Sequence, residues 1–476
     1  MRAFAAIVHL TFRNAMRSHI FQLLLLILLL CVGLIPTTVS GDGTVAGFIQ
    51  IALLYSLSSV LLVLALSSLW LGCYVMTQDI DSYQLHMVIT KPVSRVTIWL
   101  GKFSGILLIN TLLLLLSATA IYFIVVGRFY REDFSAAERT RIENEVMVGR
   151  RVYMPDRPDL DPLARQVLQQ KLKALEASNQ SVDTSPAAQE KMLADTRREI
   201  IARLAALPPG QTTGWMFSGL PAANDRPLYL RYRVYVGKVA SEGQRLTSGW
   251  WEANKPEIIE QRGANEHESA KRDAYRLIRL PLTMTPEMMK SGDFSEKTLE
   301  PQWQLVAPDG KLRLTFTNFD PMETMQYFQP GDGPKILMRV SGFAENYFRC
   351  VLVLFLELVI LTGLGCAAAA FLTMPTAVFV VISYLLFGSF ASYLSETSFF
   401  GGAADYVGYY IGKLLLIVVI PIQKFEVTNM VANGELIEFS FVWYLIWSYL
   451  LLRAVPLFVF GILLYRRREM GLVIRK

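Results

Sequence analysis

The chain has 476 residues, of which 53% are hydrophobic and only 18% are charged, and its formal net charge is +6. So low a charged fraction, with the apolar residues concentrated at both ends of the chain, excludes an ordinary soluble protein and predicts transmembrane helices. The basic residues cluster beside the apolar runs, so membrane orientation explains the positive charge, and we expect no nucleic acid among the partners.

The first region, 1–127, contains three apolar runs that are long enough to cross about 30 Å of hydrocarbon. An amphipathic interfacial helix over the first sixteen residues is expected to lead into an uncleaved first span. The predicted spans are 19–38, 48–76 and 98–126.

A polar loop between the second and third spans has the pattern of a short amphipathic helix. Asp79 and Asp81 suit a helix N-terminus, where negative charge is favourable, and Thr77 is available as its cap. Lys91 suits the C-terminal end, and Pro92 ends the helix. One face of this helix carries Ile80, Tyr83, Met87 and Val88. The loop, 78–96, therefore predicts a docking surface for a protein outside the membrane.

A polar region of about 220 residues follows, 128–345. Its first part, 132–206, is charged and helical in pattern, which predicts a helical hairpin or stalk. From 226 to 343 the apolar residues alternate with polar ones, and a Pro308-Asp309-Gly310 turn precedes one alternating stretch. This second pattern predicts a small β-sandwich.

The last region, 346–476, returns to apolar runs at 347–373, 376–395, 407–422 and 441–465. Lysine and arginine placement puts both termini and the 78–96 loop in the cytosol, which requires an even number of crossings. The short run at 407–422 is interpreted as part of a re-entrant outer segment, about 405–435. The expected fold is a polytopic α-helical membrane protein with six spans, this re-entrant element, an extracytoplasmic α+β domain and a basic cytosolic tail.

Three stretches of the chain, in this order, resemble one family. The amphipathic helix with Arg13 and Arg17 resembles a connecting helix. The loop DIDSYQLHMVITKPVSRVTIWLGK resembles a coupling helix followed by a KPvsR…lGK signature at 91–102. The stretch IPIQKFEVTNMVANG resembles an outer segment that precedes a final span. The sequence is in these respects similar to the permeases of type-2 ATP-binding-cassette (ABC) exporters, whose compact members have no counterpart of 128–345.

This resemblance implies that a separate cytosolic ABC ATPase, which carries the ATP and Mg²⁺, docks on 78–95, and that a second permease copy or homologue completes the pathway. The chain has no GxxxxGK[ST] phosphate loop, so we expect no enzymatic activity and no cofactor in this subunit. The expected location is the lipid bilayer of a bacterial cytoplasmic (inner) membrane, with 128–345 available to an envelope partner. The residues expected to couple to the ATPase are Asp79, Asp81, Tyr83, Met87, Lys91 and Arg95.

Two ionisable residues, Glu357 and Arg453, lie deep within predicted spans. An isolated charge at the centre of a bilayer costs several kcal/mol, so mutual pairing is attractive. We therefore predict an intramembrane pair that serves either as a structural ion pair or as a gate on the translocation route; the alternative is that Arg453 snorkels beside a water-filled crevice.

Two other functions fit the same pattern. A non-transporting complex of the same build would convert ATP hydrolysis into movement of its extracytoplasmic domain, which would then act on envelope proteins or lipids. A membrane-anchored scaffold or sensor would need no ATPase, but it leaves the docking loop unexplained.

Overall fold

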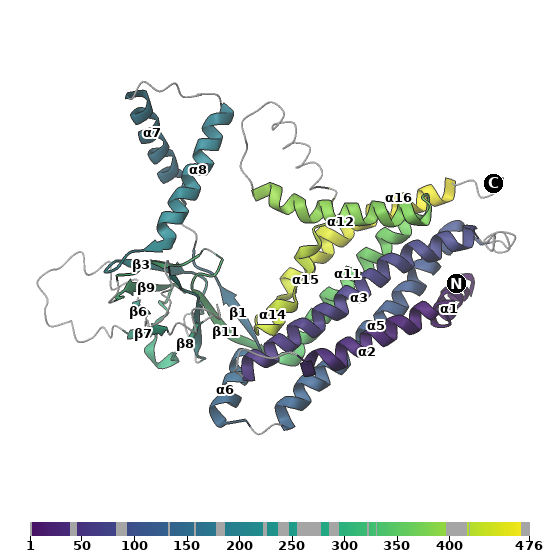
Figure 1. Ribbon diagram of the computed structural model, residues 1–476, viewed down its shortest axis with the longest axis horizontal. Helices are drawn as coiled ribbons and strands as arrows, with labels where there is room; N and C mark the ends of the chain where they lie inside the picture. Colours follow the sequence, from purple (N-terminus) through teal and green to yellow (C-terminus); the bar gives the residue numbers. More distant parts are fainter. Residues whose placement is uncertain are drawn as a thin grey trace, which may run out of the picture. The chain divides into compact units, whose positions relative to one another are not determined.

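The computed structural model describes residues 2–38, 45–81, 93–131, 134–156, 159–177, 186–221, 226–236, 247–254, 278–284, 295–320, 323–329, 331–396, 417 and 419–467. The chain divides into two compact units (Figure 1). The helical unit comprises Met1–Gly149, Ser341–Thr397 and Val407–Lys476, and the second unit comprises Arg150–Val340 and Ser398–Tyr406.

The helical unit is built from long apolar helices and a few short ones. Before the second unit it contains α1 (Arg2–Met16), α2 (His19–Thr38), α3 (Val45–Asp81), α5 (Arg95–Arg131) and α6 (Ala136–Glu145). After the second unit it contains α11 (Phe343–Ala369), α12 (Met374–Glu396), η3 (Ile422–Phe425) and α14 (Thr428–Ala432). The last helix is composite and consists of α15 (Phe439–Leu445), the π-helical η4 (Ile446–Ala454) and α16 (Val455–Arg467).

Four helices in the described part of the chain are long and apolar enough to cross a membrane, which indicates a membrane protein. They are Ala46–Gln78, Arg95–Tyr130, Phe343–Ala369 and Phe439–Arg467. A bent pair, Arg2–Met16 and Phe21–Ile35, makes a fifth candidate if its two halves count as one span. The six predicted spans are therefore confirmed only in part, because the apolar helix Met374–Gly388 is shorter and most of 407–422 lies outside the described residues.

The bend between α1 and α2 has a local cause at Ser18. The Ser18 hydroxyl donates to the Ala15 carbonyl (2.7 Å) and accepts from the backbone N–H of Phe21 (3.2 Å). Ser18 thereby closes the end of α1 and caps the start of α2, so the chain turns by 67° instead of continuing as one helix.

Helix α11 is the centre of the helical unit, and small residues let its neighbours approach closely. A Cβ atom on Gly365 would lie 2.9 Å from the Leu69 carbonyl oxygen of α3. On the other side, a Cβ atom on Gly461 of α16 would lie 2.6 Å from the Cα atom of Ala367. Such contacts are typical of membrane helices, whose association depends on close packing because lipid is as apolar as the side chains.

The boundary between the units differs from the predicted one at residue 128. Ile142 of α6 and the following Val146 are fully buried in the apolar core of the helical unit, so α6 belongs to that unit although its sequence is strongly charged. The composition of α6 suggests a polar segment of the second unit, but the burial of Ile142 and Val146 places it in the helical unit.

The second unit combines a helical hairpin with three antiparallel sheets. Its helices are α7 (Asp161–Ala177), α8 (Pro186–Ala205) and the 3-10 turn η2 (Pro301–Trp303). Its first strands are β1 (Val148–Tyr153), β2 (Ala206–Leu207), β3 (Thr212–Phe217), β4 (Leu228–Tyr232), β5 (Tyr235–Val236) and β6 (Thr247–Asn254). The others are β7 (Ile278–Met284), β8 (Ser295–Leu299), β9 (Leu312–Asn318), β10 (Gln326–Tyr327) and β11 (Lys335–Gly342). Strand β1 interrupts the stretch predicted to be helical, 132–206.

The strands form two four-stranded sheets, β1-β11-β4-β8 and β3-β9-β6-β7, and a small sheet, β2-β10-β5. Both larger sheets contribute to one apolar core, in which the Trp251 ring of β6 packs 4.9 Å from Tyr232 of β4 and 4.8 Å from Phe316 of β9. The two larger sheets therefore share their apolar faces, as the layers of a sandwich do. The Pro308-Asp309-Gly310 turn is present, with Gly310 at φ +77°.

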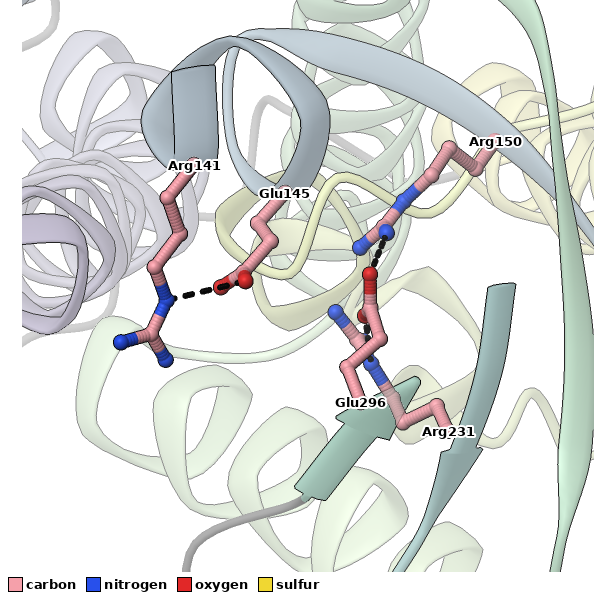
Figure 2. A network of polar contacts seen from close by, with 5 residues as sticks. All are labelled: Arg141, Glu145, Arg150, Arg231 and Glu296. Atoms are coloured by element: carbon pink, nitrogen blue, oxygen red, sulfur yellow. Dashed lines mark hydrogen bonds and ion pairs between the residues drawn. The ribbon is translucent and has the colours of Figure 1, made fainter. Parts of the chain in front are cut away.

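The opposite face of β4 carries a buried ionic cluster rather than an apolar one. Glu296 of β8 lies between Arg150 of β1 and Arg231 of β4, at 2.6 Å and 3.1 Å (Figure 2). The three side chains are 0%, 12% and 6% exposed for Arg150, Glu296 and Arg231. All five residues of β4 are consequently buried, although the sequence of this strand alternates between apolar and polar residues.

Candidate functional site

The predicted docking loop connects α3 to α5, so the first candidate site is the end of the helical unit where these helices meet. The C-terminal ends of α3 and α16 and the N-terminal end of α5 lie together there, near both chain termini (Figure 1). Ser94 caps α5, since its hydroxyl accepts from the backbone N–H of Thr97 (3.1 Å).

Helix α1 packs along α5 at this end, and two glycines spaced by four residues make the contact. A Cβ atom on Gly101 would lie 2.7 Å from Ile7 Cγ2, and one on Gly105 would lie 2.7 Å from Thr11 Cβ. Gly101 belongs to the KPvsR…lGK stretch of the sequence, and this contact assigns it a packing role.

Three polar side chains of α5 fasten its first turns to the last turns of three other helices. Lys102, which is 4% exposed, donates from Nζ to the Val75 carbonyl of α3 (2.8 Å). Arg95 donates from Nη1 to the Arg466 carbonyl of α16 (2.7 Å), and Trp99 donates from Nε1 to the Cys366 carbonyl of α11 (3.3 Å). Cys366 and Arg466 lie in the last turns of their helices, where carbonyls lack intrahelical donors, so two of these bonds satisfy otherwise unpaired acceptors, whereas the Lys102 bond is an additional one to a carbonyl inside α3. Sequence reasoning missed the role of Trp99. For this group of contacts, the available signal in the sequence was the charge of Lys102 inside an apolar run.

The predicted start of the docking helix is wrong. Helix α3 continues without interruption to Asp81, so Asp79 and Asp81 lie in the last turn of a helix and not in the first. Thr77 lies inside α3, where its hydroxyl donates to the Cys73 carbonyl (3.0 Å) instead of capping a new helix. Between Gly72 and Pro92 the sequence contains neither glycine nor proline, so nothing stops α3 at Thr77.

The remaining predicted docking residues, Tyr83, Met87 and Lys91, lie outside the described residues. Arg95 is the first residue of α5. Basic residues lie at this end of the unit, because Arg95 begins α5 and Arg466 and Arg467 end α16; Arg2 and Arg13 belong to α1, and Arg17 follows it. Flanking cations of this kind are typical of the cytosolic side of membrane proteins.

The second candidate site is the irregular segment 419–437, which includes η3 and α14 and overlaps the predicted re-entrant element. It is largely buried against the helices of its own unit: Val419, Ile420, Phe425, Val431 and Ile437 are among its buried residues. A Cβ atom on Gly388 of α12 would lie 2.8 Å from the Ile420 carbonyl oxygen, and Ser58 of α3 contacts Thr428 of α14 through their hydroxyls (3.1 Å). Non-helical backbone is stable at membrane depth when protein surrounds it and supplies its hydrogen bonds.

Arg453 supplies one of these hydrogen bonds. It lies in the π-helical η4 and donates from Nη1 to the Val419 carbonyl (2.8 Å), while its guanidinium lies 4.9 Å from the centre of the Tyr449 ring. Tyr384 of α12 acts beside it, since its hydroxyl accepts from the backbone N–H of Ile420 (3.0 Å). Sequence reasoning identified Arg453 but missed Tyr384, because an aromatic residue in an apolar helix gives no signal of a polar partner.

The structure does not bring Glu357 and Arg453 together as an ion pair. Glu357 lies on α11, is 4% exposed, and its Oε2 atom has no hydrogen-bond partner among the residues that the structure describes. Arg453 is occupied by the carbonyl of Val419, since the 419–437 segment passes beside η4 and offers an acceptor that sequence spacing does not reveal.

No group of three or more His, Cys, Asp or Glu side chains that would suit a metal ion occurs within the described part of the chain. Comparison with known proteins finds no matching family model, no matching curated protein and no matching solved structure.

Proposed function

We propose that this chain is the membrane subunit of an ABC exporter and that a separate cytosolic ATPase docks on residues 78–95. A second copy or homologue would complete the pathway in a bacterial cytoplasmic membrane. Glu357 is buried in the central helix, its Oε2 atom has no hydrogen-bond partner within the described part of the chain, and it is the candidate polar element of the route.

The observation that carries the proposal is the length and fastening of α3 and α5. Each helix has 37 residues and is about 55 Å long at 1.5 Å per residue, which exceeds the hydrocarbon core of about 30 Å. Both helices therefore extend beyond a bilayer, and the bond from Lys102 to Val75 locks them to each other near the connection.

The fastening supports force transfer into the helical unit. A push on residues 78–95 would act on α3 and α5 directly, on α16 through Arg95 and on α11 through Trp99. A surface joined to four helices in this way suits a partner that delivers mechanical work, whereas a scaffold would need no such connections.

The test is co-purification of the full-length chain from its native membrane in mild detergent. We expect the wild-type chain to bring down a nucleotide-binding ATPase subunit. The double variant Tyr83→Asp, Met87→Asp places two charges on the apolar face of the predicted docking helix and should lose the ATPase, with the thermal unfolding of the chain unchanged.

Arg141→Ala is the matched control, because Arg141 is an exposed residue of α6 outside the docking loop. It should retain the ATPase. If the wild-type chain purifies without any nucleotide-binding protein, or if the double variant retains it fully, the proposal is contradicted.

A further inference from the structure

Within the described residues, the chain passes between the two units at two positions. It leaves the helical unit between Gly149 and Arg150 and returns between Val340 and Ser341. These two crossings lie on β1 and β11, which are neighbours in one sheet. Gly149 and Ser341 of the helical unit are therefore each joined through one peptide bond to a residue of the second unit.

Leu436, near the end of the 419–437 segment, lies against Gly149 of the first crossing. A Cβ atom on Gly149 would lie 3.1 Å from Leu436 Cδ1 and 3.3 Å from Asn346 Cβ, and it would overlap the Ser341 hydroxyl. Leu436 is buried. Gly149 of the first crossing thus lies close to Ser341 of the second crossing, to Leu436 and to Asn346 in the first turn of α11.

The amide of Asn346 holds the backbone on both sides of Leu436. Its Nδ2 donates to the Glu435 carbonyl (2.8 Å), and its Oδ1 accepts from the backbone N–H of Ile437 (2.9 Å). Arg349, one turn further along α11, donates from Nη1 to the Ile437 carbonyl (2.9 Å). Three hydrogen bonds therefore fix residues 435–437 to the start of α11.

Gly434 extends the contact to the connection before the first crossing. Its φ of +65° is a conformation that favours glycine, and a Cβ atom there would overlap the Glu145 carbonyl at the end of α6 and lie 3.3 Å from Val148 Cγ1. The end of the 419–437 segment is thus in close contact with residues that come just before the second unit in the sequence, Glu145 and Val148, and with Asn346, which comes just after it.

The beginning of the same segment is held by different helices. Val419 accepts from Arg453 of η4, and Ile420 donates to Tyr384 of α12. Between its two ends the segment is packed on α3 through Thr428. A shift of η4 or α12 therefore acts on a buried segment with few ways to absorb it.

We propose that the 419–437 segment is a mechanical link that passes movements of η4 and α12 to the second unit through Gly149 and Ser341. The link depends on the proposed function, because the ATPase would be the source of the movement. The ATPase would drive the second unit as well as the helices.

Hydrogen–deuterium exchange on the full-length chain in lipid nanodiscs tests the link without the ATPase. Tyr384→Phe removes the acceptor of the Ile420 N–H, and Arg453→Gln removes the donor to Val419. Each should increase exchange by about fivefold, the effect of one lost hydrogen bond, at 419–421 and also at 434–437, 148–150 and 341–342.

Asn346→Leu should uncouple the two ends of the link. In this background, Tyr384→Phe should still increase exchange at 419–421 but should add nothing at 148–150 and 341–342. Ser67→Ala is the matched control, because it also removes one buried hydrogen bond of the helical unit, the one to Asn110 (3.1 Å), without contacting the segment.

The link is overturned if Tyr384→Phe and Arg453→Gln change exchange only at 419–421, or if Ser67→Ala produces the same increase at the crossings. Because no ATPase is present, this outcome is independent of the co-purification result. A chain that binds its ATPase but lacks the link would remain a permease, with a second unit that the helices do not drive.

Discussion

Gly72 of α3 and Gly365 of α11 lie in direct contact. A Cβ atom placed on either glycine would lie 3.3 Å from the Cα atom of the other. The central helix of the unit is therefore positioned by two residues without side chains. A close approach of backbones at this depth is how membrane helices gain packing energy.

Gly365→Ala should destabilise the helical unit by about 1–3 kcal/mol, because the new methyl group would meet the Leu69 carbonyl oxygen at 2.9 Å and the helices would have to separate. Thermal unfolding in detergent measures the change. Gly33→Ala on α2 is the control, since nothing lies within 4 Å of its Cβ position. Equal unfolding temperatures for the two variants would contradict the packing role of Gly365.

Gly101→Val should detach α1 from α5, because the added atoms would overlap the side chain of Ile7. Hydrogen exchange at 2–16 should increase, while α5 itself, held by Lys102 and Trp99, should stay protected. Gly127→Val, on the same helix and with an open Cβ position, should leave α1 protected. Unchanged exchange in both variants would show that Gly101 has no packing role.

Glu296→Gln should destabilise the second unit by about 3–5 kcal/mol, because Arg150 and Arg231 would lose their shared carboxylate in a buried setting. Arg141→Ala breaks the exposed i,i+4 pair with Glu145, in which Arg141 is 52% exposed, and should cost less than about 0.5 kcal/mol (Figure 2). Chemical denaturation of the full chain compares the two. Similar losses would show that burial of the cluster is not decisive.

Tyr232 predicts a loss of stability at alkaline pH. Burial raises its pKa to about 12, whereas an unfolded tyrosine releases its proton near pH 10. Its stabilising effect is therefore complete below about pH 10, and as pH rises the unfolded state binds fewer protons, so the free energy of unfolding falls, by roughly 2–3 kcal/mol up to about pH 12.

Tyr232→Phe should remove this alkaline component from the unfolding curve of the second unit, as followed by denaturation at a series of pH values. Tyr327→Phe, whose hydroxyl lies at the surface, should keep it. Phenolate absorbance of the folded chain offers an independent check. In the Tyr232→Phe variant, one tyrosine fewer should ionise near pH 12 than in the wild-type chain.

Much of the helical unit could be predicted from hydropathy. The predicted run 19–38 coincides with α2, and 441–465 lies within the observed apolar helix Phe439–Arg467. Apolar runs of this length form helices because a bilayer offers the backbone no other hydrogen-bond partners, so a local signal is sufficient. The strands at 228–232 and 312–318 were predictable for a similar reason, since their alternation reports one apolar face.

Helix ends and polar partners were less predictable. Thr77 and Asp79 have the residue types of a helix N-terminus, yet α3 passes through them because nothing in the local sequence stops it. Arg453 was recognised as a buried charge, but its acceptor, the Val419 carbonyl, is a backbone atom 34 residues away, and any residue type would supply it. Residue identity carries no information about such a partner.

Long apolar helices and a polar, strand-containing insertion follow from the sequence alone, because hydrophobic length and period are local properties that each segment carries with it. The packed fold was needed to show which glycines let helices touch, which carbonyls Lys102, Arg95 and Arg453 satisfy, and that Asn346 holds the backbone around Leu436. Those contacts join residues far apart in the chain, and their geometry exists only once the helices have packed.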